Sequence, residues 1–182
     1  METWVALLRG INVGGHRKLP MQRLVEILEG LGYSAVRTYI QSGNAVFRAS
    51  RPKGPDIAEA IDNTMGFRPE VLLISYRRFE EAVRANPFPD AVDDPKSLHL
   101  FFLAGEASSN AEERLADVAS DREEFVLAPG VLYLHALDYL TGSRIGERAE
   151  RLLGTPTTAR NWNSASRILA LAEGVDSGGD DA

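Results

Sequence analysis

Three polar stretches of this 182-residue chain hold residue types that can bind an anionic ligand. The first, Leu8–Lys18, contains the candidate ligand-binding residues Arg9, Asn12, Gly14, Gly15, His16 and Lys18. Its glycines let backbone N–H groups approach a ligand closely, and it precedes a helix start, where an anion is favoured. It matches neither common phosphate-loop pattern. A flexible connection whose glycines only satisfy backbone geometry is therefore an equally good interpretation.

The second stretch, Tyr39–Asn44, places the side-chain amides of Gln41 and Asn44 at the tip of an expected hairpin. A tight turn uses Gly and Asn for purely local reasons, which favours a structural role. Gln41 lies one position beyond what the turn requires. Both residues are therefore kept as candidate ligand-binding residues.

The third stretch, 155–164, contributes the candidate residues Arg160, Asn161 and Asn163. Thr157 or Thr158 is expected to cap a helix near 160–172. Asparagines are poor helix formers, so two of them in the first turns indicate side chains with specific partners. The simpler interpretation is a capped helix with a solvated polar face.

The composition excludes several kinds of chemistry. The chain has no cysteine, so disulfides, thiolate catalysis and cysteine-based zinc sites are excluded. Its histidines, His16, His99 and His135, are far apart in the sequence, which disfavours a metal site. No nucleophile motif is present, and we expect no cofactor and cannot assign a catalytic residue.

The charge of the chain is unevenly distributed. The whole chain carries a net charge of −6, whereas residues 1–51 hold seven Lys or Arg and three Glu, a local charge of +4. The overall charge argues against non-specific nucleic-acid binding by the whole surface. The basic first part is either ordinary scatter on solvated faces or a local patch that attracts an anion.

The elements that must position these residues follow from hydrophobic spacing. The first half is expected as strand 4–8, a helix opened by Pro20, a hairpin of strands 36–41 and 45–48, a helix over 57–65 and strand 71–74. This β-α-β-β-α-β order is ferredoxin-like. The second half is expected as strand 98–103, a helix at 111–118, a hairpin of 125–127 and 131–134, and helices at 144–153 and 160–172. It shows no obvious last strand.

We therefore predict an α+β fold with two ferredoxin-like (βαββαβ-type) subdomains packed as one unit, the second incomplete or variant. The predicted boundaries are 1–86 with a connecting helix, 87–172 with the C-terminal helices, and a disordered acidic tail at 173–182. The apolar run 4–8 is too short for a signal peptide, and no stretch approaches the ~20 apolar residues of a membrane helix. We expect a cytoplasmic protein with no membrane partner.

Taken together, the three stretches resemble the domain-of-unknown-function 1697 family. The resemblance rests on Ala6–Gly15, Thr38–Asn44 and Thr158–Asn163, and it spans nearly the whole chain. It implies an α+β fold with two ferredoxin-like subdomains. It implies no established activity and no catalytic residues.

The preferred hypothesis is a binding or regulatory module, not an enzyme, for a small ligand that carries phosphate or carboxylate groups. A nucleotide or another phosphorylated metabolite fits, with the three stretches meeting at one end of the first sheet. Nucleic acid is weakly supported, because Tyr39 is the only obvious stacking aromatic nearby.

Two alternatives remain open. The first is an enzyme acting on a phosphorylated metabolite or nucleotide at the same pocket, with His16 as acid or base and Arg160 stabilising negative charge. The second is a structural scaffold whose polar side chains bind loop backbone and leave no ligand site. The sequence predicts no oligomeric state.

Overall fold

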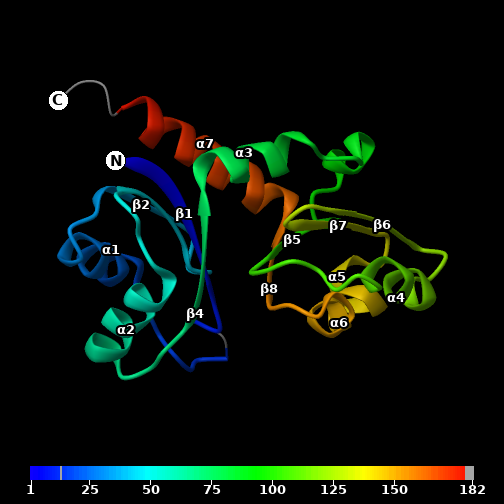
Figure 1. The fold of residues 1–182 in the computed structure, drawn as a ribbon, viewed down its shortest axis with the longest axis horizontal. Coiled ribbons are helices and arrows are strands. Elements are labelled where there is room, and N and C mark those ends of the chain that lie inside the picture. Colours follow the sequence, from blue (N-terminus) through cyan, green and yellow to red (C-terminus); the bar gives the residue numbers. More distant parts are fainter. Residues whose placement is uncertain (13, 179–182) are drawn as a thin grey trace. The chain divides into compact units, whose positions relative to one another are not determined.

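The computed structural model describes residues 1–12 and 14–178. It has an α+β fold with two four-stranded antiparallel sheets, each flanked by helices (Figure 1). The chain divides into two compact units. One comprises residues 1–81 and the chain from 167 onward, and the other comprises residues 82–166.

The first unit has the predicted β-α-β-β-α-β order. Its elements are β1 (Glu2–Arg9), α1 (Met21–Gly30), β2 (Ser34–Tyr39), β3 (Asn44–Ala49), α2 (Gly54–Met65) and β4 (Glu70–Ser75). The strand order is β2-β3-β1-β4, with every neighbouring pair antiparallel. This is the ferredoxin-like topology expected from the hydrophobic spacing.

Strand β1 is buried on both faces. Ala6 and Leu8 belong to a core with Leu24, Leu28 and other residues of α1 and α2. Val5 and Leu7, on the opposite face, are fully buried too. The C-terminal part of α7 (Trp162–Ser177) belongs to the same unit and lies beside β2, where the two elements line one pocket.

The second unit repeats the topology with a strand that the sequence analysis missed. Helix α3 (Tyr76–Arg84) begins in the first unit and ends in the second, where the short helix η1 (Pro89–Asp93) follows it. Next come β5 (Leu98–Leu103), α4 (Ala111–Val118), β6 (Glu123–Ala128), β7 (Val131–Ala136), α5 (Tyr139–Gly142), α6 (Arg144–Leu153) and β8 (Thr157–Asn161). The strand order is β6-β7-β5-β8, so this sheet is complete.

The prediction that the second half lacks a last strand was wrong. Thr157 and Thr158 do not cap a helix but pair with β5, and both are buried. Threonine is β-branched and favours a strand when a partner strand is present. The helix begins at Trp162, and the side chain of Asn161 accepts a hydrogen bond from the Ser164 N–H at 2.9 Å, as an N-cap does.

The last helix also differs from its prediction. Helix α7 continues to Ser177, through residues expected to be disordered, because buried Val175 extends the apolar stripe of Ala172 by one turn. From Arg167 the helix belongs to the first unit, whereas the predicted boundaries placed it with the second half. Residues 179–182 of the predicted tail lie outside the described residues.

A buried carboxylate joins three elements of the second unit. Glu123 accepts hydrogen bonds from the Ser143 hydroxyl, from the Ile145 N–H at 3.2 Å, and from the N–H and hydroxyl of Ser120 at 3.0 and 2.9 Å. Burial raises the pKa of the Glu123 carboxyl, but these hydrogen bonds outweigh it, so the net effect is a lowered pKa. The start of β6 is thereby fixed to the start of α6.

One buried histidine makes the fold sensitive to acid. His99 on β5 is 8% exposed, and among the described residues its Nδ1 has no hydrogen-bond partner. Burial disfavours the charged imidazolium and lowers the pKa of His99 to about 4. The unfolded chain takes up this proton near its ordinary pKa of about 6.5. Folding stability therefore falls as the pH drops through this window.

We expect His99→Leu to remove this acid sensitivity. As the pH falls from ~6.5 to ~4, the free energy of unfolding of wild type should decrease relative to that of the variant by up to about 3 kcal/mol. Urea unfolding of both proteins at several pH values measures the difference. If the free energies of unfolding of the two proteins changed with pH in the same way across this window, the buried imidazole of His99 would not be neutral.

Candidate functional site

The first two polar stretches lie at the same edge of the first sheet. Strands β1 and β2 are both antiparallel to β3, so the loop after β1 and the turn after β2 leave the sheet on one side. The Leu8 N–H donates to the carbonyl oxygen of Gly43 at 2.8 Å. The structure therefore brings the glycine-rich loop and the hairpin turn together.

The side chain of Asn12 joins this loop to the turn. Its Nδ2 donates to the carbonyl oxygens of Leu19 at 3.0 Å and of Gln41 at 2.7 Å, and its Oδ1 accepts from the Leu19 N–H at 2.8 Å. The Asn12 N–H donates to the carbonyl oxygen of Arg17 at 3.1 Å. Asn12 itself adopts a left-handed backbone with φ of 54°, which asparagine tolerates better than most residues. These contacts close the base of the loop.

The hairpin turn is fixed by close packing and by a buried amide. Gly43 has φ of +78°, and a Cβ atom there would lie 2.7 Å from Ile11 Cδ1 and 2.8 Å from Leu8 Cβ. Asn44 is 1% exposed, and its Nδ2 donates to the Tyr39 carbonyl oxygen at 3.0 Å and to Ser42 Oγ at 2.9 Å. The amide of Asn44 thus serves the turn.

The tip of the loop, in contrast, faces open space. Gly14 and Gly15 have positive φ, and a Cβ atom on either would meet nothing within 4 Å. The side chains of His16, Arg17 and Lys18 are exposed. Val13 lies outside the described residues. A group that approaches the tip therefore meets glycine backbone and basic side chains.

The other predicted residues of the first unit have mixed roles. Arg9 forms an ion pair with Glu70 at the start of β4, with Nε and Oε2 3.1 Å apart. The side chain of Gln41 is exposed, while its carbonyl oxygen accepts from Asn12. Ile40, which the sequence analysis did not single out, has φ of 47° and is 51% exposed. No local pattern separates it from the strand residues before it.

The third stretch lies at the end of β8, in the second unit. Burial lowers the pKa of the Arg160 guanidinium to about 10, and Nη1 donates to the Ala159 carbonyl oxygen at 2.8 Å. Asn161 caps α7, and Asn163 is exposed. That the third stretch meets the other two stays a prediction.

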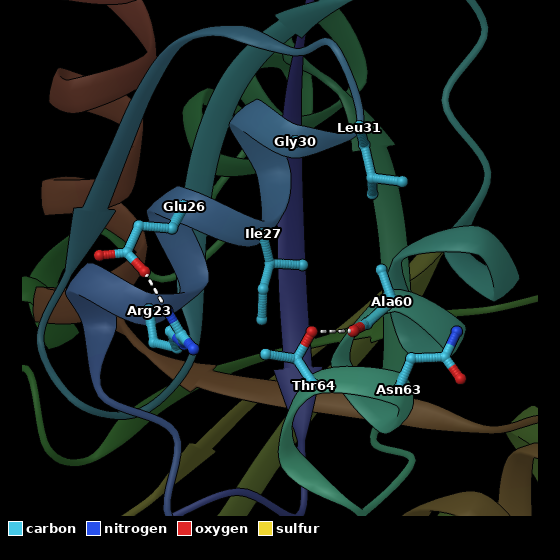
Figure 2. A pocket seen from close by; sticks show the side chains of 8 residues that line it. All are labelled: Arg23, Glu26, Ile27, Gly30, Leu31, Ala60, Asn63 and Thr64. Atoms are coloured by element: carbon cyan, nitrogen blue, oxygen red, sulfur yellow. Dashed lines mark hydrogen bonds and ion pairs between the residues drawn. The ribbon is translucent and has the colours of Figure 1, made fainter.

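A separate pocket of about 390 Å³ lies between α1 and α2 (Figure 2). Ile27, Leu31 and Ala60 supply apolar surface, and the Arg23–Glu26 ion pair, at 2.6 Å, borders it. Gly30 lines it with no side chain, in an ordinary helical conformation. No residue of the three polar stretches lines this pocket.

No group of three or more His, Asp or Glu side chains could hold a metal ion in the part of the chain that the structure describes. Within the same residues, no helix is both long and apolar enough to cross a bilayer.

Comparison with known proteins places the chain in a family. The family described as Protein of unknown function (DUF1697) matches residues 1–133. The chain belongs to this family. No curated protein matches it. A solved structure, the conserved bacterial protein SP0830 from Streptococcus pneumoniae, shares the fold, with a TM-score of 0.67 and 21% identity over 94% of this chain and 98% of that protein.

Asn12→Ala should destabilise this DUF1697 protein by about 2–4 kcal/mol, because three side-chain hydrogen bonds are lost and alanine resists a positive φ. Asn12→Asp keeps the acceptor for the Leu19 N–H but turns a carboxylate oxygen toward the carbonyl oxygens of Leu19 and Gln41, so a loss of similar size is expected. Urea unfolding measures both. A change below about 1 kcal/mol for Asn12→Ala would show that the loop base does not depend on this side chain.

Two glycine substitutions should change the stability of the fold in opposite directions. Gly43→Ala should cost about 2 kcal/mol or more, because the new methyl overlaps Leu8 and Ile11 at a positive φ. Gly30→Ala should stabilise the chain by about 0.5–1 kcal/mol, since α1 is helical there and the methyl meets nothing. Thermal unfolding of the two variants and wild type gives the comparison. If the two substitutions changed the melting temperature equally, Gly43 would not be packed against Leu8 and Ile11 as described.

Proposed function

We propose that this protein is a binding module whose glycine-rich loop holds the phosphate or carboxylate group of a small ligand. The observation that carries the proposal is the contrast within one loop. Asn12 closes its base through Leu19, Gln41 and the carbonyl oxygen of Arg17, while Gly14, Gly15 and the side chains of His16, Arg17 and Lys18 are exposed. A fixed base lets the tip bind with little ordering cost.

The chemistry of the tip suits an anion. Basic side chains form charge-assisted hydrogen bonds with phosphate or carboxylate oxygens. Consecutive glycines at positive φ leave the backbone accessible to a ligand, because no Cβ atom intervenes. In this account Asn12 and Asn44 position the loop and the turn, and Arg17, which was not among the predicted site residues, joins the ligand contacts.

The two alternatives are weaker. An enzyme would need His16 to act from within a cleft, and its side chain is exposed instead. A scaffold alone accounts for the hydrogen bonds of Asn12, Asn44 and Asn161, but it gives no role to the exposed basic tip. We therefore favour ligand binding by the tip.

A thermal-shift assay at low salt tests the proposal, with pyrophosphate, citrate and ATP as probes. A probe at 100 times its Kd should add about 2.7 kcal/mol of stability to wild type. Lys18→Gln and Arg17→Gln should lose most of this shift. Lys96→Gln, the same charge change in the second unit, should keep it.

No shift with any of the three probes would contradict the proposal. An equal shift in wild type and in both loop variants would contradict it as well, because the anion would then bind elsewhere. Unfolding of the unliganded variants serves as the control for folding.

A further inference from the structure

The two sheets have four edge strands, and their backbones are not equally protected. Strands β2 and β4 border the first sheet, and β6 and β8 border the second (Figure 1). The unpaired N–H and C=O groups of an edge strand can pair with a strand of another chain. Bulges, covering elements and side chains that bind the edge backbone prevent such pairing.

The first sheet protects both of its edges. On β2 the register shifts between Ser34 and Arg37, and Arg37 Nη1 donates to the Val36 carbonyl oxygen at 2.9 Å. On β4, Gly54 at the start of α2 lies against the strand, since a Cβ atom on Gly54 would be 2.7 Å from the Val71 carbonyl oxygen. An added strand would have to displace these groups.

Strand β8 of the second sheet is protected in the same way as β2. Arg160 Nη1 donates to the carbonyl oxygen of Ala159 at 2.8 Å, and the Thr157 N–H donates to Glu150 Oε1 at 3.0 Å. An arginine therefore folds back onto the preceding carbonyl at an edge of each sheet.

Strand β6 has none of these features. It pairs with β7 residue by residue over its whole length, without a bulge. Within the described part of the chain, no side chain binds the backbone of residues 124–128. Val126, in the middle of the strand, is 39% exposed. A regular, partly apolar edge strand is a surface on which another strand can pair.

We propose that β6 pairs with β6 of a second copy of this chain, antiparallel and about a two-fold axis at Val126. The β6-β7-β5-β8 sheets of the two copies then form one continuous eight-stranded sheet. Because the axis is perpendicular to the sheet, Val126 lies opposite Val126 of the second copy. Phe125, on the helix-covered face, lies opposite Leu127, which packs on the same core.

Charge selects this arrangement. Both acidic residues of β6, Glu123 and Glu124, are at one end of the strand. A parallel pairing would place Glu124 beside Glu124 of the second copy, and like charges directly opposite are destabilising. In the antiparallel pairing Glu124 lies opposite Ala128, and the acidic ends point apart. A two-fold dimer presents the same surface twice, and this strand is complementary to itself.

The association state tests the inference. Sedimentation of wild type over a concentration series should show a reversible dimer. Val126→Lys brings two ammonium groups together at the axis and should weaken dimerisation by about tenfold or more. Val126→Thr, which keeps a β-branched side chain, should keep the dimer. Circular dichroism of each variant checks that the exposed substitution leaves the fold intact.

A cross-link tests the geometry, because the chain has no cysteine of its own. Opposite residues of an antiparallel pair have Cα atoms about 4.5–5.5 Å apart, within disulfide reach. Val126→Cys should oxidise quickly to a covalent dimer, whereas Thr38→Cys, on protected β2, should oxidise slowly. A monomer at all concentrations, a dimer unaffected by Val126→Lys, or equal cross-linking of the two cysteines would overturn the inference.

Discussion

The side-chain amide of Asn12 is the interaction on which the candidate site depends. It binds both the N–H and the carbonyl oxygen of Leu19, which close the loop, and the carbonyl oxygen of Gln41, which belongs to the hairpin turn. Without these hydrogen bonds, a loop of this length could adopt many conformations. Since the bonds use both polar atoms of the amide, Asn12 acts as a positioning residue, and the ligand contacts that we propose lie at the tip.

This constraint divides the polar residues into two groups. Asn44 and Asn161, like Asn12, use their amides on nearby backbone, in a turn and in a helix cap. The basic residues at 16–18 are exposed beyond the closed base of the loop. This arrangement suits an anion, because the neutral amides of the framework form no ion pairs with the basic side chains of the tip. Those side chains are left to bind the charge of the ligand.

The sequence was sufficient for the first subdomain and insufficient for part of the second. Apolar spacing is local, and it was enough to predict the six elements from β1 to β4. Thr157 and Thr158 suit either a helix cap or a strand, and only pairing with β5, more than fifty residues earlier in the chain, decides between them. The ion pair of Arg9 with Glu70 is equally non-local. Thr157 or Thr158 was expected to cap the last helix, whereas Asn161 holds that position.

The most direct test of this account is a titration of the ¹⁵N-labelled protein with pyrophosphate, followed through its backbone amide signals. Binding at the loop tip should give saturable shifts at Gly14, Gly15 and Lys18, with little change at Asn12, whose hydrogen bonds remain in place. Shifts confined to the pocket between α1 and α2, or no shifts at the loop tip, would contradict it.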